Sequence, residues 1–159
     1  MHFRTQHSYD ASPERVYAML TDAEFLGGMM TSPSIQDHQV SVDGSHTVVR
    51  ASLAAPAQVA RFTGNTLQVT LDIDWATASP DGGRRGPIVV SVAKLPAKLA
   101  GTATLAPQGA GTTVTYEGEF SVSLPLVGGK LEGMAAPYIT RVLDAQQTTG
   151  RAWLAAHPA

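Results

Sequence analysis

The sequence predicts an α+β fold, in which a curved antiparallel sheet of six to seven strands carries two short helices and a long C-terminal helix packed across it. Three observations lead to this fold class. Apolar and polar residues alternate with period two through most of the chain, as they do in half-buried antiparallel strands. Two short helical segments lie near the N-terminus. Residues 129–156 have apolar residues near helical spacing, and only this segment is long enough to cover a sheet face.

The strands follow from the alternation and from the turns between apolar segments. Residues 67–75 and 113–124 alternate most clearly between a dry face and a wet face. The second of these strands is long and must bend, and Gly118 is where a bend or a close backbone approach is easiest. The longest loop is expected at 79–87, with Arg84-Arg85 at a solvated tip. The predicted strands are 3–9, 36–42, 45–53, 67–75, 88–93, 98–105 and 113–124.

The helices follow from capping signals and apolar spacing. Ser12, Pro13 and Glu14 have the order of an N-cap, a first-turn proline and an acid that complements the helix dipole. A capping-box pattern that begins at Thr21 predicts a second short helix, which ends at about residue 28. In the C-terminal helix, Pro137 removes one backbone hydrogen bond and should kink the helix. Whether such a kink would gate a cavity is left open.

Composition restricts the class of protein. The chain has 159 residues and 16.7 kDa, of which 43% are hydrophobic and 15% charged, so we expect one globular domain spanning residues 1–159. The net charge of −2 does not favour binding to nucleic acid or to an anionic membrane. Neither a signal peptide nor a membrane span is visible, so we expect a cytoplasmic protein without stable membrane insertion. The absence of cysteine fits a reducing compartment. The oligomeric state cannot be predicted.

Two segments resemble a known family. Residues 9–22, YDASPERVYAMLTD, resemble the opening of the Bet v 1-like, START-related superfamily, which includes polyketide cyclase and lipid-transport members. Residues 124–132, LPLVGGKLE, resemble one branch of it, domain-of-unknown-function family 2505. The resemblance implies a helix-grip fold with a cavity between the sheet and the long helix. In relatives that cavity binds hydrophobic molecules or hosts simple chemistry on them. Pro137 departs from the usual pattern of the final helix.

The histidines do not predict a metal site. His2 and His7 are an odd number of residues apart and face opposite sides of one strand. The dipeptide Asp43-Gly44 favours a hairpin turn in which Val42 pairs with Ser45, and this register places His38 and His46 on opposite faces. We therefore expect no metal and no cofactor.

Other catalytic motifs are also missing from the sequence. The carboxylate pairs Asp72/Asp74 and Glu117/Glu119 lie on the wet faces of their strands, where they add solubility instead of catalysis. No serine lies in a Gly-x-Ser-x-Gly motif, and no glycine-rich segment matches a phosphate-binding loop. No catalytic residue is therefore assigned.

An apolar cavity is the positive prediction. Aromatic residues share the predicted dry layer with Gly101, Ala103 and Gly118, and methionines follow the second helix, where helix-grip relatives place a cavity entrance. An otherwise apolar pocket with a few polar groups is typical of a small-molecule site, and Tyr116, Tyr138 and His38 would supply those groups. The predicted ligand-binding residues are Phe25, Met29, Met30, His38, Trp75, Tyr116, Phe120, Met134 and Tyr138.

Three functions fit these observations. The first is binding of a hydrophobic small molecule, such as a fatty acyl, isoprenoid or polyketide-like ligand. The second is a cyclase, dehydratase or hydrolase that uses His38, Tyr116 and Tyr138 for general acid–base catalysis. The third is a protein with a solid core that binds partners and no ligand. The same side chains would then form an ordinary packed interior, with His38 buried and hydrogen-bonded to a neighbour.

Overall fold

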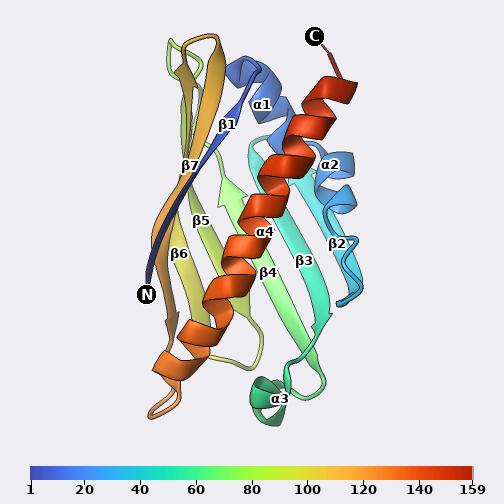
Figure 1. Cartoon of the computed structure of the whole chain (residues 1–159), viewed down its shortest axis with the longest axis vertical. Helices are drawn as coiled ribbons and strands as arrows, with labels where there is room; N and C mark the ends of the chain where they lie inside the picture. Colours follow the sequence, from blue (N-terminus) through green and yellow to red (C-terminus); the bar gives the residue numbers. More distant parts are fainter. Residues whose placement is uncertain (159) are drawn as a thin grey trace.

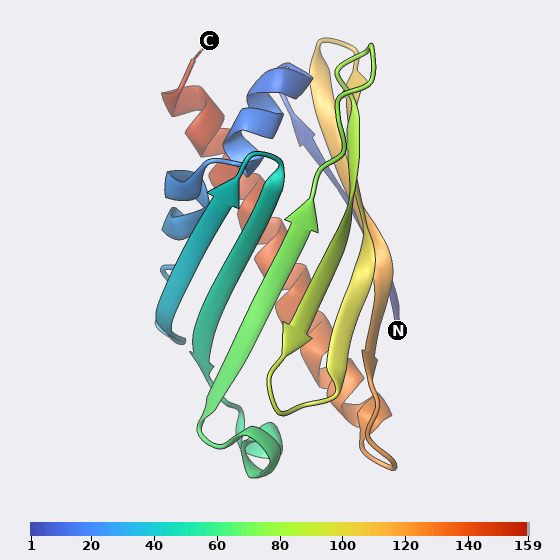
Figure 2. The ribbon, with the colours of Figure 1, turned by 180° about the vertical axis from the view of Figure 1, so that it is seen from behind.

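The computed structural model describes residues 1–158, so Ala159, the last residue of the predicted domain, lies outside the described residues. Seven antiparallel strands form one sheet, in the order β1-β7-β6-β5-β4-β3-β2. The long helix α4 crosses the concave face of this sheet, and the predicted architecture is confirmed (Figures 1 and 2). The strands are β1 (His2–Tyr9), β2 (Ile35–Asp43), β3 (His46–Ala54), β4 (Thr66–Asp74), β5 (Arg84–Val92), β6 (Ala97–Gln108) and β7 (Gly111–Val122). The helices are α1 (Pro13–Leu20), α2 (Ala23–Gly28), α3 (Ala57–Thr63) and α4 (Gly128–Ala156).

The β2–β3 hairpin corrects the predicted register. Gly44 and Ser45 form the two-residue turn, so Asp43 pairs with His46 and Val42 does not pair with Ser45. Gly44 has a φ of 60°, and a glycine at the first central position suits a hairpin turn of this length. The correction leaves His38 and His46 on opposite faces, as predicted.

Strand β5 begins earlier than expected. It takes up the second half of the segment predicted as a loop at 79–87. Pro87 is tolerated because the ladder between β4 and β5 ends at the pair Ile73 and Ile88, so the proline needs no donor there. Arg84 is not a solvated tip: its guanidinium lies 3.7 Å from the centre of the Tyr17 ring and donates to the Ala76 carbonyl at 3.1 Å.

The close backbone approach expected at Gly118 is present. Gly118 pairs directly with Gly101 on β6, and the two backbones approach closely. A Cβ atom added to Gly101 would overlap the Glu117 carbonyl and lie 2.8 Å from the Gly118 Cα atom. Only glycine permits this approach, so the pair fixes the position at which β6 and β7 come together.

The short helices confirm one predicted cap and correct another. The Ser12 hydroxyl accepts from the Arg15 amide and starts α1, as predicted. The N-cap of α2 is Asp22, which accepts from the Phe25 amide at 3.0 Å. Thr21 is instead the C-cap residue of α1, and its hydroxyl donates to the Tyr17 carbonyl at 2.8 Å. Helix α3 was not predicted, because it is short and Pro56 before it provides no side-chain cap.

Helix α4 is continuous through Pro137. Pro137 and Gly133 both lie on the exposed side of the helix, where water can bond the Gly133 carbonyl that has lost its donor. The proline therefore does not end the helix. Within residues 1–158, no helix combines the length and the apolar character that a membrane crossing needs.

Candidate functional site

The buried apolar residues form two separate clusters on the concave side of the sheet. The upper cluster lies at the end of the molecule where α1, α2 and the end of α4 cover the sheet (Figure 1). The lower cluster lies at the opposite end, near α3 and the start of α4. The upper cluster consists of Tyr9, Ala11, Val16, Met19, Leu20, Phe25, Ile73, Trp75, Ile88, Ala103, Leu105, Val114, Tyr116 and Leu154. The lower cluster consists of Val59, Ala97, Val122 and Leu131.

A row of apolar side chains crosses the concave face between the clusters and remains partly exposed. The ladders pair Leu71 with Val90, Val90 with Leu99, and Leu99 with Phe120, so these four residues form one line across β4, β5, β6 and β7. We call them the mid-sheet row. All four are only partly buried, although none of their strands is at an edge of the sheet. The concave face is therefore not fully covered at its middle.

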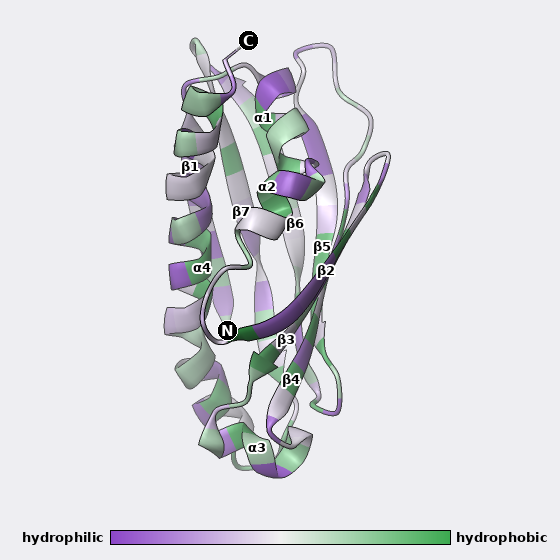
Figure 3. Ribbon diagram, turned by 90° about the vertical axis from the view of Figure 1, so that its right-hand side faces the viewer, coloured by the Kyte–Doolittle hydropathy of each residue, from purple (hydrophilic) through white to green (hydrophobic). Residues whose placement is uncertain are grey.

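The position of α4 explains this exposure. The helix packs mainly against β7, β1 and α1, and so it covers one side of the concave face (Figure 3). Met134 and Leu143 on the helix are also partly buried, and they pack against the lower and upper clusters respectively. At the lower end a surface pocket of about 240 Å³ lies between α3 and α4, with Leu131 and Met134 in its lining. The middle of the concave face thus presents apolar surface from both the sheet and the helix.

The predicted ligand-binding residues are divided between these regions. Phe25, Trp75 and Tyr116 are 1%, 3% and 6% exposed and belong to the upper cluster, and Met29 packs against it. Phe120 belongs to the mid-sheet row, and both it and Met134 pack against the lower cluster. Met30, His38 and Tyr138 belong to neither cluster. The nine side chains therefore do not converge on one point.

Tyr138 is placed differently from the expectation. It is 59% exposed, and the Arg141 guanidinium lies 5.3 Å from its ring centre. Leu131, one heptad earlier, is buried, so a straight continuation of its stripe would also bury Tyr138. The covered side of α4 instead moves around the helix, through the partly buried Leu143 to the buried Gly150.

His38 faces the concave side, as predicted, but it is exposed. It lies beside Gly27 of α2, on a strand at the edge of the sheet. The expectation of a buried, hydrogen-bonded histidine is wrong because α2 lies beside the His38 ring without burying it. Tyr116 lies on β7, at the other side of the same sheet. The three polar groups proposed for acid–base catalysis are thus separated from one another.

His7 and Tyr9 are buried polar residues that the sequence analysis overlooked. His7 is 1% exposed, its ring centre lies 5.4 Å from that of Tyr116, and its Nδ1 atom is 3.4 Å from the Tyr9 hydroxyl. The regular alternation of Phe3, Thr5, His7 and Tyr9 on one face of β1 is the signal that could have identified them.

Burial favours the uncharged forms of these three side chains. It lowers the pKa of His7, an effect that Asp144 opposes and Arg151 reinforces. Burial also raises the pKa of Tyr9 to about 12 and raises the pKa of Tyr116. Within residues 1–158, three buried polar atoms have no hydrogen-bond partner: His7 Nε2, Thr47 Oγ1 and Trp75 Nε1. All three belong to side chains at the upper part of the concave face, where they could bond a polar group of a ligand.

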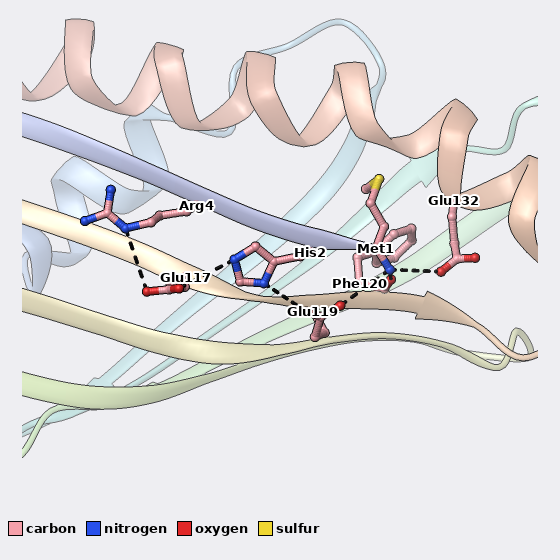
Figure 4. A network of polar contacts seen from close by, with 7 residues as sticks. All are labelled: Met1, His2, Arg4, Glu117, Glu119, Phe120 and Glu132. Carbon is pink, nitrogen blue, oxygen red and sulfur yellow. Dashed lines mark hydrogen bonds and ion pairs between the residues drawn. The ribbon is translucent and has the colours of Figure 1, made fainter.

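The acidic pairs lie on the convex face, as predicted. His2 contacts Glu119 at 2.8 Å and Glu117 at 3.5 Å, and Arg4 lies 3.8 Å from Glu117 (Figure 4). These side chains are at least half exposed, which is typical of surface ion pairs of small energetic value. Among the described residues, no three histidine, aspartate or glutamate side chains are grouped as metal ligands.

Comparison with known proteins agrees with this architecture. The family model described as "Protein of unknown function (DUF2505)" matches residues 4–154. The chain belongs to the DUF2505 family. No curated protein is similar to this DUF2505 chain in sequence.

Solved structures share the fold at low sequence identity. The protein TTHA0849 from Thermus thermophilus is 18% identical, with a TM-score of 0.69 and 100% of both chains covered. A STAR-related lipid transfer protein from Xanthomonas axonopodis is 18% identical, with a TM-score of 0.65 over 96% of this chain and 85% of its own. The Zhui aromatase/cyclase from Streptomyces sp. R1128 is 12% identical, with a TM-score of 0.62 over 96% and 92%. The predicted helix-grip fold is thereby confirmed.

Proposed function

We propose that this DUF2505 protein binds a hydrophobic small molecule between the concave face of its sheet and α4. The observation that carries the proposal is the partial exposure of the mid-sheet row on interior strands. Apolar side chains at such positions are normally covered, because protein interiors are closely packed. A ligand over Leu71, Val90, Leu99 and Phe120 would join the two clusters and remove this surface from water.

The geometry also supports a ligand with a polar end. The mid-sheet row offers apolar contact, and each Å² of apolar surface removed from water contributes roughly 25 cal/mol. The three unpartnered polar atoms at the upper part of the concave face lie on different strands, and any one of them would bond a hydroxyl or carbonyl group. A lipid, an isoprenoid and a polyketide-like molecule all combine these features. The lipid transfer protein and the aromatase/cyclase of the same fold are consistent with this class.

The first experiment is native mass spectrometry of the purified full-length chain, followed by solvent extraction and identification of any released molecule. A discrete bound mass with an apolar body would support the proposal and would identify the ligand class. A protein without bound mass that also fails to bind anilinonaphthalene sulfonate and long-chain fatty acids under native conditions would contradict it. In that case the ligand-free interaction protein would be favoured.

A pair of neighbouring substitutions tests the location of the site. Val90→Trp would place a large side chain in the mid-sheet row, whereas Val89→Trp would place the same side chain on the convex face. Val89 is 36% exposed, so its replacement should leave the concave face unchanged. Val90→Trp should lower the affinity for an apolar probe by about tenfold or more, and Val89→Trp should leave it within about twofold. Equal effects of the two variants would show that the probe binds elsewhere.

A further inference from the structure

The lower end of the molecule concentrates positive charge. Three connections meet there: α3 between β3 and β4, the turn between β5 and β6, and the segment from β7 to α4 (Figures 1 and 3). All three lysines of the chain lie in or beside these connections, although the chain contains eleven basic residues. We call the exposed side chains Arg61, Lys94, Lys98 and Lys130 the basic tip.

Acidic residues are sparse around the basic tip. The three connections contain no carboxylate, and Glu132, in the first turns of α4 beside them, lies 3.3 Å from the N-terminal amine of Met1. Within residues 1–158, no carboxylate forms an ion pair with any of the four cations of the basic tip. The overall charge of −2 therefore hides a local excess of positive charge at this end of the molecule.

Apolar side chains protrude from the same end. Leu126 is 104% exposed and has a φ of 70°, a left-handed conformation that a leucine rarely adopts. The partly exposed Phe62 lies under the Arg61 guanidinium, 4.7 Å from it. The surface pocket between α3 and α4 is lined by Arg61 and Lys130 together with Val127, Leu131 and Met134. Cations and exposed apolar groups thus share one surface.

We propose that the basic tip docks on the surface of an anionic lipid bilayer, with Leu126 inserted at the level of the headgroups. Basic residues are attracted to anionic lipids, and an exposed leucine beside them gains free energy on leaving water. Arg61 and Lys130 would meet the headgroups at the mouth of the pocket between α3 and α4. This inference does not depend on the proposed binding of a small molecule, since docking needs only the tip.

The test is co-sedimentation of the full-length chain with lipid vesicles. One set contains phosphatidylcholine alone, and the other contains roughly one-third phosphatidylserine. We expect the protein to sediment only with the vesicles that contain phosphatidylserine. This binding should be lost when the salt concentration is raised from about 0.1 M to about 1 M. Equal sedimentation with both sets, or none with either, would overturn the proposal.

Substitutions locate the surface. Lys94→Gln combined with Lys130→Gln should weaken vesicle binding by about 25-fold, since each basic residue contributes about fivefold at such a surface. Leu126→Asn should weaken it by about tenfold and should not harm folding, because asparagine accepts left-handed backbone. The matched controls are Arg50→Gln on the convex face and Val142→Asn on the outer side of α4, both at exposed positions.

The controls should change vesicle binding by less than about twofold. If they weaken it as much as the tip variants do, the attraction is not located at the tip and the proposal fails. Light scattering without vesicles tests whether a second copy of the chain covers this surface instead. A dimer that Leu126→Asn converts to monomers would assign this surface to contact between copies of the chain, and would overturn membrane docking.

Discussion

The upper cluster and the mid-sheet row occupy the same concave face, yet helices cover only the first of them. Phe25 is 1% exposed because α1, α2 and α4 meet around it, and its ring lies 5.6 Å from that of Trp153. Phe120 on β7 has the same side chain and remains partly exposed. The difference shows that burial on this face is determined by where the helices lie, since the sheet is continuous through both regions.

The largest expected effect is a difference in the free energy of unfolding between alanine variants of these two phenylalanines. Phe25→Ala should lower the free energy of unfolding by about 3–5 kcal/mol, because it leaves a cavity in a closely packed cluster. Phe120→Ala should lower it by about 1–2 kcal/mol, because that ring already contacts water. Urea unfolding followed by circular dichroism measures both. Similar losses for the two variants would mean that the mid-sheet row is as tightly packed as the upper cluster.

A pair of glycines tests whether the close approach of β6 and β7 shapes this face. Gly101→Ala should lower the free energy of unfolding by about 2–3 kcal/mol, because its Cβ would overlap the Glu117 carbonyl. Gly133→Ala is the matched control, since no described atom lies within 4 Å of its Cβ position. It should raise the free energy of unfolding by about 0.5–1 kcal/mol through helix propensity. A neutral Gly101→Ala would contradict the close approach.

His7 makes the upper cluster sensitive to pH. Burial lowers its pKa below the usual value of 6.5, so the unfolded chain takes up a proton at a higher pH than the folded protein does. The stabilisation from a neutral His7 is complete above about pH 6.5 and is lost as the pH falls below that value. His7→Gln should flatten the dependence of unfolding free energy on pH below about pH 6.5. An unchanged slope in His7→Gln would exclude this role.

The smallest effect concerns the strained residue at the lower end. Leu126→Asn should raise the free energy of unfolding by about 0.5–1 kcal/mol, because asparagine tolerates a φ of 70° better than leucine and no packing is lost. Val142→Asn, at a helical position that is 60% exposed, should lower it slightly. Thermal melting detects both changes. A destabilised Leu126→Asn would indicate contacts of this leucine beyond those described.

The sequence predicted those features of the fold that depend on a few neighbouring residues. The Ser12 cap, the alternation in β4 and β7 and the close approach at Gly118 each follow from a few neighbouring residues. Thr21 was mistaken for a cap because it and Asp22 are both good capping residues, and only the tertiary arrangement determines which one bonds. Burial at Tyr138 and His38 could not be predicted, since it depends on how α4 and α2 lie over the sheet. The burial of His7 could have been predicted from the alternation along β1, which places His7 on the same face as Phe3 and Tyr9.

The pairing of β1 with β7 also determines when the protein can fold during its synthesis. His2 bonds Glu119, a residue 117 positions later in the chain. Until β7 leaves the ribosome, β1 has no partner, and the concave face lacks one side as well as its covering helix α4. At translation rates of about 5–20 residues per second, this interval lasts roughly 6–23 s. For that time an unpaired strand is exposed to other chains, and the nascent protein depends on chaperones or on the solubility of its polar face to avoid aggregation.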